Sequence, residues 1–423
     1  MKYINIIIFC LIGVSGFSQN KYNQFFTENS LRVDFLFSGN SKAEHIFLNK
    51  LKKEPFWGGS RINLVDTFNY GKYKFEVIDK ASSSIIFSKG FCTLFEEWQT
   101  ITEAKTLNKA MPQTINLPYP KKEVVLKLYS RNKNGIFKQV FELEINPKNY
   151  FINPEKYFTQ TEKLIDNGES SQKIDLAFIA EGYTTNEMNK FKNDVLRLVK
   201  YMFSVEPFKK YRKSFNIWLI KSESNESGTD IPKEKIYRKT ILNSSFYTFN
   251  SERYLMTEDY FTVKDIASTV PYDNICIIVN SKKYGGGGIY NYYCISSADH
   301  KLSSKVFVHE FGHSFAGLAD EYYTSSTAYN NFFNLEIEPW QPNLTTLVNF
   351  SRKWNTLIDK STPIPTPRDN KYSNTIGVYE GGGYVNKGMY SPYMDCRMKS
   401  NQTDSFCPIC QQAIEKIILF KTK

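Results

Sequence analysis

The spacing of the apolar residues changes near residue 150, and this change constrains the fold more than any other feature of the chain. From about residue 20 to residue 150, short stretches alternate apolar and polar residues, and turn residues such as Asn134-Gly135 separate them. A period of two is typical of strands that bury one face. We therefore expect a β-sandwich domain over residues 20–150. Its predicted strands span residues 31–39, 73–79, 84–98, 123–131 and 136–145.

A different pattern begins after two Asn-Pro pairs near residue 150, which mark a linker. Residues 174–180 form a continuous apolar run, and Thr184 to Glu187 has the spacing of a helix capping box. Apolar residues then recur at helical intervals, and further apolar strands follow at 215–222 and 274–280. Buried strands that alternate with helices are typical of a covered, mostly parallel sheet. The chain is thus predicted to be an α+β or α/β multidomain protein, with its second domain over residues 151–423.

Residues 309–313 read His-Glu-Phe-Gly-His, which is the His-Glu-x-x-His pattern of zinc peptidases. On a helix, His309 and His313 project from one face, one turn apart, and neutral imidazole is a preferred zinc ligand. Glu310 lies beside the first histidine, where it can act as the general base that activates water. The pattern predicts a zinc site with two of its protein ligands on one helix.

The helix that carries this motif has recognisable ends. Ser303 or Ser304 can cap its start, and Gly317 is suited to a left-handed helix end. Just past Gly317 the chain presents Asp320 and Glu321, two oxygen donors. We prefer Asp320 as the third ligand because its shorter side chain suits a ligand fixed by a turn, and Glu321 remains the competing candidate.

A third ligand on a later helix is the alternative arrangement. It requires a glutamate within a downstream helical pattern. Glu336 and Glu338 lie in a proline-containing stretch, and Glu380 precedes three glycines. None of these residues fits that arrangement.

The segment HEFGHSFAGLADEYY, with IDLAFIAEGYT upstream and YGGGGIYN between them, resembles the IgA-peptidase family of bacterial, metzincin-like zinc metallopeptidases. The resemblance covers about residues 160–420, and the β-rich front is similar to the N-terminal domain that accompanies the family. It implies a zinc endopeptidase in which His309, His313 and Asp320 hold the metal and Glu310 is the base. The metzincin layout has a third histidine six residues after the second; here a carboxylate stands seven residues after His313.

Metzincins also carry a methionine turn beneath the zinc, and GMYSPYMDCRMKS at residues 388–400 resembles that turn. The resemblance implies that Met398 forms the base of the site. Met394 is the rival methionine. Ser391 stands where the family pattern leads us to expect arginine.

Six cysteines remain once the N-terminal segment is set aside, and three of them are close together at Cys396, Cys407 and Cys410. A zinc knuckle needs four ligands, and no fourth cysteine or histidine is near in the sequence. We therefore favour a disulfide from Cys396 to Cys407 or Cys410, or buried thiols.

A glycine-rich stretch at residues 284–297 lacks the spacing and lysine of a phosphate loop. Four glycines before a strand-like run suit the close approach of another chain. We expect residues 289–297 to pair with a protein or peptide substrate in extended form; a flexible hairpin is the alternative.

Residues 1–19 have the lysine, short apolar run and small residues of a signal peptide, so we expect a secreted or periplasmic protein. No later stretch is apolar enough for a stable membrane span. The formal net charge is +11, but the lysines are scattered, which argues against nucleic-acid binding. The oligomeric state is not encoded in these patterns.

These features predict a secreted zinc-dependent endopeptidase with Glu310 as general base. One alternative is a secreted binding protein that keeps the peptidase scaffold without turnover, although the intact Glu310 argues against it. Another is a zinc amidase that acts on cell-wall peptides. Nothing in these residues specifies immunoglobulin A as the substrate.

Overall fold

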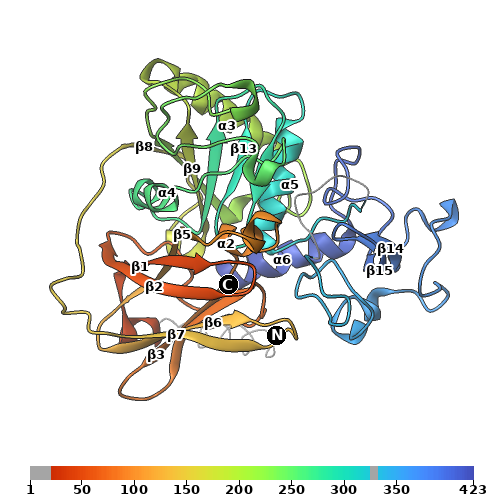
Figure 1. Cartoon of the computed structure of the whole chain (residues 1–423), viewed down its shortest axis with the longest axis horizontal. Coiled ribbons are helices and arrows are strands. Elements are labelled where there is room, and N and C mark those ends of the chain that lie inside the picture. Colours follow the sequence, from red (N-terminus) through yellow and green to blue (C-terminus); the bar gives the residue numbers. More distant parts are fainter. Residues whose placement is uncertain (1–20, 324–331) are drawn as a thin grey trace, which may run out of the picture.

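The computed structural model describes residues 21–323 and 332–423. The predicted signal peptide at residues 1–19 lies outside the described residues. The fold is mixed α/β with several sheets, and its N-terminal region is rich in strands (Figure 1). This confirms the predicted mixed α/β class and the β-rich N-terminal region.

The N-terminal region, strands β1 to β7, consists of a three-stranded sheet in the order β2-β1-β5 and a four-stranded sheet in the order β4-β3-β6-β7. All pairings within these sheets are antiparallel. The strands are β1 (Phe26–Gly39), β2 (Glu44–Glu54), β3 (Tyr73–Asp79), β4 (Ile85–Phe91), β5 (Lys109–Pro120), β6 (Val124–Arg131) and β7 (Phe137–Ile145).

The two sheets face each other across an aromatic core. Phe35 of β1 meets Phe141 of β7 edge to face, with ring centroids 5.3 Å apart, and Phe37 of β1 meets Tyr73 of β3 at 5.1 Å. Edge-to-face contacts of this kind are favourable beyond the burial of area alone. Alternation along β3, where every second residue is buried, produces this core as the sequence predicted.

One predicted strand is only half correct. Residues 84–98 were expected to be a single strand, but β4 ends at Phe91 and a short helix, α2 (Leu94–Trp98), follows. The Thr93 side chain accepts a hydrogen bond from the Glu96 amide, and the Glu96 side chain accepts one from the Thr93 amide. This capping box starts a helix where apolar content alone indicated a strand.

The C-terminal region contains a six-stranded sheet in the order β12-β13-β11-β9-β10-β8. Its four inner strands are parallel, as predicted, and the two edge strands are antiparallel to their neighbours. The strands are β8 (Gln160–Ile165), β9 (Ile174–Glu181), β10 (Phe215–Lys221), β11 (Asn274–Val279), β12 (Gly286–Gly288) and β13 (Cys294–Ser297).

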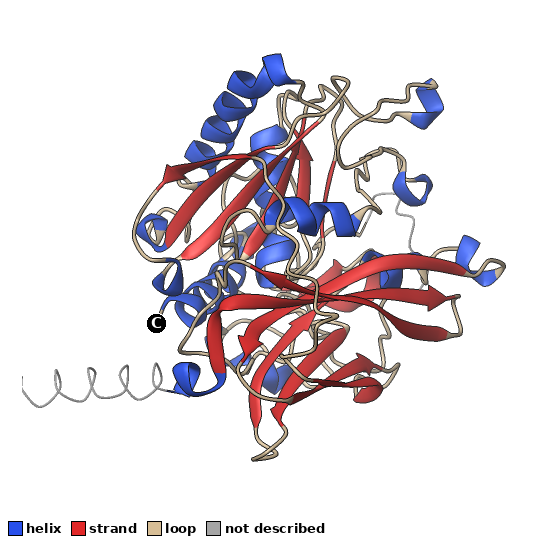
Figure 2. Cartoon of the chain, turned by 90° about the vertical axis from the view of Figure 1, so that its left-hand side faces the viewer, coloured by secondary structure: helices blue, strands red, loops and turns tan. Residues whose placement is uncertain are grey.

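Both faces of this sheet are covered. Leu176 and Phe178 of β9 face an apolar cluster that includes α3 (Met188–Met202), α5 (Ser303–Ala316) and α6 (Pro408–Thr422). Ala177 and Ile179, which point the other way, join the cluster of the N-terminal region and of α4 (Tyr260–Ala267). The N-terminal region therefore serves as one covering layer of the C-terminal sheet (Figures 1 and 2).

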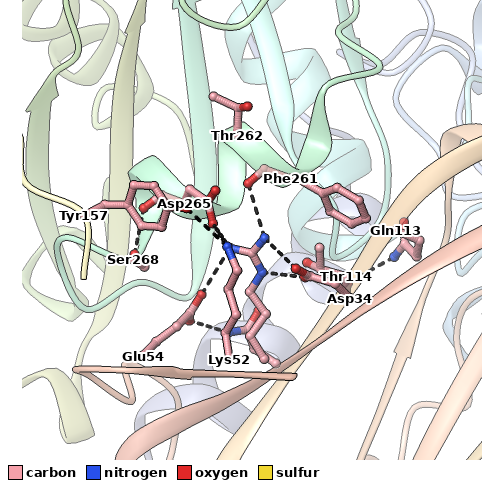
Figure 3. A network of polar contacts seen from close by, with 12 residues as sticks. Asp34, Lys52, Glu54, Gln113, Thr114, Tyr157, Phe261, Thr262, Asp265 and Ser268 are labelled. Atoms are coloured by element: carbon pink, nitrogen blue, oxygen red, sulfur yellow. Dashed lines mark hydrogen bonds and ion pairs between the residues drawn. The ribbon is translucent and has the colours of Figure 1, made fainter. Parts of the chain in front are cut away.

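A buried charge network joins the two regions. Arg32 of β1 donates to both carboxylate oxygens of Asp34 and also to Asp265 of α4, at 2.6 Å. Lys52 of β2 donates to the same oxygen of Asp265 at 2.7 Å. Figure 3 shows Asp34, Lys52 and Glu54 of the front strands facing Asp265. Paired in this way, the buried charges fix the orientation of the N-terminal region against α4.

Helix α5 differs slightly from its prediction at its start and agrees at its end. Neither serine caps it, because the N-cap residue is Leu302 and the helix begins at Ser303. Gly317 ends it in the left-handed conformation, with φ of +63°. A side chain there would also meet the Trp340 ring at 2.7 Å. The turn after α5 thus requires glycine for two reasons.

A small antiparallel hairpin, β14 (Tyr379–Gly382) with β15 (Val385–Ser391), follows α5 in the chain, and short 3-10 turns occur between the other elements. Among the described residues, no helix is both long enough and apolar enough to cross a bilayer.

Candidate metal centre

Helix α5 brings His309 and His313 together on one face. Their Nε2 atoms are 3.1 Å apart, and their rings lie edge to face. The Nδ1 atom of His309 donates to the carbonyl of Arg397 at 2.9 Å, and that of His313 donates to the carbonyl of Leu318 at 2.6 Å. Because each carbonyl can only accept, both Nδ1 atoms carry protons, and both Nε2 atoms, which offer a lone pair in the neutral imidazole, are directed at the same point.

Asp320 supplies a third donor at that point. Its Oδ1 atom is 3.0 Å from Nε2 of His309 and 3.3 Å from Nε2 of His313. Apart from these two contacts, this buried oxygen has no hydrogen-bond partner within the described part of the chain. The other oxygen, Oδ2, accepts a hydrogen bond from the hydroxyl of Tyr384. That bond orients the carboxylate, so that Oδ1 faces the two histidines.

The separations of the three donor atoms suit zinc. Two ligands at about 2.0–2.1 Å in a tetrahedral arrangement are roughly 3.4 Å apart. The observed separations of 3.0 to 3.3 Å are close to that edge length. Each imidazole is oriented by the hydrogen bond that its Nδ1 atom donates, and the carboxylate by the one that its Oδ2 atom accepts. Two imidazoles and one carboxylate held in this way fit three ligand positions of a zinc ion.

The electrostatics of the pocket also favour a cation. Burial opposes a charge on His313, but Asp320 and Glu310 raise its pKa to about 9. Burial likewise opposes a charge on Asp320, yet the histidines hold its pKa well below the usual range. The carboxylate is therefore ionised, and it attracts positive charge to the space between the donors.

Glu310 lies next to these donors. One of its carboxylate oxygens and the ring nitrogens of His309 and His313 all lie within 4.8 Å of one another. Burial raises the pKa of Glu310, and the two histidines only partly oppose this effect. No hydrogen bond to its carboxylate occurs within residues 21–323 and 332–423, so this group remains available as an acceptor.

A cleft opens above the donors, and residues that the sequence did not single out line it. Arg253 donates to the Tyr322 hydroxyl at 3.2 Å and places a positive charge in the cleft. Tyr384, which orients Asp320, has a φ of 67° and follows three glycines. The glycines signal a tight turn, but no local pattern indicates that this turn meets the metal centre.

The N-terminal region contributes to the same cleft through α2. Glu96 and Glu97 are among the lining residues, and Glu97 accepts a hydrogen bond from the hydroxyl of Tyr254. Because the two regions share one core, this wall of the cleft is fixed relative to α5.

Met398 lies beneath the helix that carries the histidines. Its side chain is fully buried, and its sulfur would be 2.9 Å from a Cβ added to Gly312. Gly312 therefore allows the close approach of the methionine to α5. Met394, the rival, is only partly buried. Ser391, where arginine was expected, is buried in β15.

The side chains of Asp320 and Glu321 face opposite sides of the segment after Gly317. Asp320 faces the two histidines, whereas Glu321 faces Cys410, whose sulfur donates to it at 3.2 Å. The peptide group between the two residues is held in place, because its carbonyl accepts from the Gly383 amide and its N–H donates to the carbonyl of Met398.

The three neighbouring cysteines are free thiols in the structure, as are Cys92, Cys276 and Cys294. The sulfurs of Cys396 and Cys410 are 3.8 Å apart, too far for a disulfide, which needs about 2.05 Å. The favoured disulfide is therefore wrong for this structure, and the alternative of buried thiols describes it.

The glycine-rich stretch also differs from its prediction. Strand β13 lies between β12 and β11, so both of its edges are already paired. The edge strand is β12, and Gly286 in it already pairs with Arg253 and Leu255. A Cβ at Gly288 would lie 2.2 Å from the carbonyl of Glu310. The glycines bring β12 against α5, and residues 289–297 are not free to pair with a substrate.

The donors on α5 and Asp320 form a candidate metal centre, and the family comparison places the chain among peptidases. The family model described as IgA Peptidase M64 matches residues 163–373 and 368–418, and the model described as Peptidase M64 N-terminus matches residues 21–142. The chain belongs to the M64 family of IgA peptidases. No curated protein matches the chain.

Proposed function

We propose that the protein is a secreted, zinc-dependent endopeptidase in which His309, His313 and Asp320 hold the metal. The observation that carries the proposal is the placement of the buried Asp320 Oδ1 within 3.3 Å of both Nε2 atoms, with no hydrogen-bond partner in the described residues besides these histidines. The membership of the family supports peptide hydrolysis as the reaction. Export rests on the sequence of residues 1–19 alone.

When bound, zinc supplies a Lewis acid that makes water acidic near neutral pH and polarises the scissile carbonyl. Glu310 takes the proton from water as general base and transfers it to the leaving amine. Tyr384 keeps the Asp320 carboxylate oriented, and the two backbone carbonyls keep both imidazoles in the required tautomer.

Arg253 is suited to stabilise negative charge that develops on the substrate. Burial alone would lower its pKa, but Tyr322, Asp320 and other neighbours raise it, so the guanidinium stays charged. A fixed cation in a partly dry cleft stabilises an oxyanion more strongly than water does. We assign it this role together with the hydroxyl of Tyr322, to which it donates.

The test compares Glu310→Gln with the wild type. We expect both proteins to hold the same amount of zinc, measured by elemental analysis, and cleavage of a peptide library to fall by about 10²–10⁴-fold in the variant. Glu336→Gln is the matched control, because Glu336 is exposed and outside the cleft. It should retain both zinc and activity.

The outcomes separate the alternatives. A wild-type protein that holds zinc but cleaves neither proteins nor cell-wall peptides would support the binding-protein alternative. Cleavage of cell-wall peptides without cleavage of proteins would support the amidase. Unchanged peptide cleavage in Glu310→Gln would remove Glu310 from the mechanism.

A further inference from the structure

A second group of donor atoms lies on the other side of the segment that carries Asp320. Glu321, Cys396, Cys407 and Cys410 each offer one atom, and these four atoms all lie within 4.8 Å of one another. All four residues are buried, with at most 3% of any of them exposed. They come from three separate segments, namely the turn after α5, the loop of Met398 and the start of α6.

The start of α6 presents two of the sulfurs. Cys407 is the N-cap residue, Pro408 follows in the first turn, and Cys410 lies three residues after the cap. A Cys-x-x-Cys pair at the start of a helix brings both sulfurs to the same side, as zinc sites commonly use it. The amide of Cys407 also donates to the sulfur of Cys396 at 3.2 Å, a contact that favours a thiolate there.

Glu321 supplies the fourth donor. The Oε1 atom accepts from the amide of Asn343 at 2.9 Å and from Cys410. Asn343 is itself held by two hydrogen bonds to the backbone of Ala319. The Oε2 atom is buried and, within the described residues, has no partner. A carboxylate oxygen left in this state is costly unless a cation is bound beside it.

We propose that Glu321, Cys396, Cys407 and Cys410 bind a second zinc ion, with a structural role. Two thiolates bound to zinc at about 2.3 Å in a tetrahedral arrangement have sulfurs roughly 3.8 Å apart. The separation of the Cys396 and Cys410 sulfurs is 3.8 Å. Three thiolates are soft ligands that favour zinc over magnesium or calcium, and four buried protein ligands leave no position for a substrate.

The second ion would support the first site through the backbone. The Glu321 amide donates to the carbonyl of Met398 at 2.8 Å, and the neighbouring carbonyl of Arg397 accepts from His309. A metal ion bound by both Glu321 and Cys396 would therefore restrict the backbone at Asp320. It would also restrict the carbonyl of Arg397, which orients His309. This inference does not depend on the proposed peptidase activity, because the second ion contacts no residue of the cleft assigned to catalysis.

The experiment separates the two metal sites by their ligands. The full chain is prepared as wild type, as His309→Ala/His313→Ala, and as Cys407→Ser/Cys410→Ser, and the zinc content of each is measured by elemental analysis. We expect two equivalents in the wild type and one in each double variant. Cys276→Ala is the control, because Cys276 is buried in β11 away from both groups, and it should hold two.

A spectroscopic measurement covers the case in which the cysteine variant fails to fold. The His309→Ala/His313→Ala chain is exchanged into Co²⁺, and its near-ultraviolet absorption is recorded. Charge transfer from thiolate to cobalt is expected, because the cysteine group is the one of the two donor groups that remains to bind the ion. The proposal would be overturned if the His309→Ala/His313→Ala protein held no metal, or if its cobalt form showed no thiolate absorption band. So would mass spectrometry that finds a disulfide among the three cysteines of the purified wild type.

Discussion

The two donor groups differ in one respect that decides their roles. The histidine side chains are about 15% exposed at the floor of a cleft, and their group has three protein donors. The cysteine group has four donors and is almost completely buried. Zinc sites with three protein ligands and an open position are typical of catalysis, and closed sites with four are typical of structure. Adjacent residues, Asp320 and Glu321, belong to the two groups, so we assign the proposed catalytic and structural roles to the two sides of one segment.

Removal of metal should produce the largest difference between the groups. Brief treatment with a chelator is expected to abolish cleavage, because the cleft exposes the histidine site, while the near-ultraviolet circular dichroism and the melting temperature stay unchanged. Added zinc should restore activity. If fold and activity were lost together over one range of chelator concentration, the histidine group would be no more accessible to the chelator than the cysteine group, which would contradict this prediction.

Alanine at each of the two adjacent carboxylates should separate their roles. Asp320→Ala removes a donor from the histidine group, so we expect about a 10²-fold or greater loss of cleavage with little change in stability. Glu321→Ala removes a ligand of the cysteine group and leaves Asn343 without its buried acceptor, so we expect unfolding free energy to fall by about 1–3 kcal/mol. Kinetics and denaturant titration measure the two effects. The reverse pattern would show that Glu321 is the ligand of the catalytic site.

Tyr384→Phe tests whether the Tyr384 hydroxyl strengthens metal binding by orienting Asp320. Loss of the hydroxyl that donates to Asp320 should weaken zinc binding about 10–100-fold, as measured by competition with a chelator. Tyr379→Phe is the matched control, since that hydroxyl donates to the carbonyls of Tyr372 and Thr375. Equal zinc affinities in the two variants would remove Tyr384 from the site.

Met398→Leu should have the smallest effect. The side chain packs against Gly312 between the two donor groups, and a swap of similar volume costs less than about 1.5 kcal/mol in a core. We expect both equivalents of zinc to remain and cleavage to change little. A selective loss of one ion would show that the methionine sulfur does more than fill space.

The strands and helices that the sequence predicted are those with strong periodicity. Strand β9 and helix α3, which follows its Thr184–Glu187 capping box, are where the apolar spacing placed them. Within the N-terminal region two strands were missed, β2 and β5. Most residues of β2 are exposed or half-buried, and β5 contains Pro112 and Pro118, which an edge strand tolerates.

The residues of the candidate site also separate into those that local sequence patterns predict and those that only the tertiary fold reveals. The two histidines and Glu310 form a local pattern on one helix, so the sequence alone brings them together. The choice between Asp320 and Glu321 depends on the direction in which the backbone leaves Gly317, and adjacent residues give no local signal for it. The partnership of Glu321 with Cys410 spans 89 residues, so only the tertiary fold reveals that a carboxylate completes the cysteine group.

Helix α2 has a consequence for how such an enzyme diversifies. A wall of the cleft comes from a part of the chain that contributes no donor to either metal group, and Glu97 there touches Tyr254 directly. We therefore expect mutations in α2 to change which substrates are accepted without altering the proposed metal ligands. We expect new substrate specificities to arise in α2, which precedes the histidines by more than 200 positions in the chain and contributes none of the donor residues.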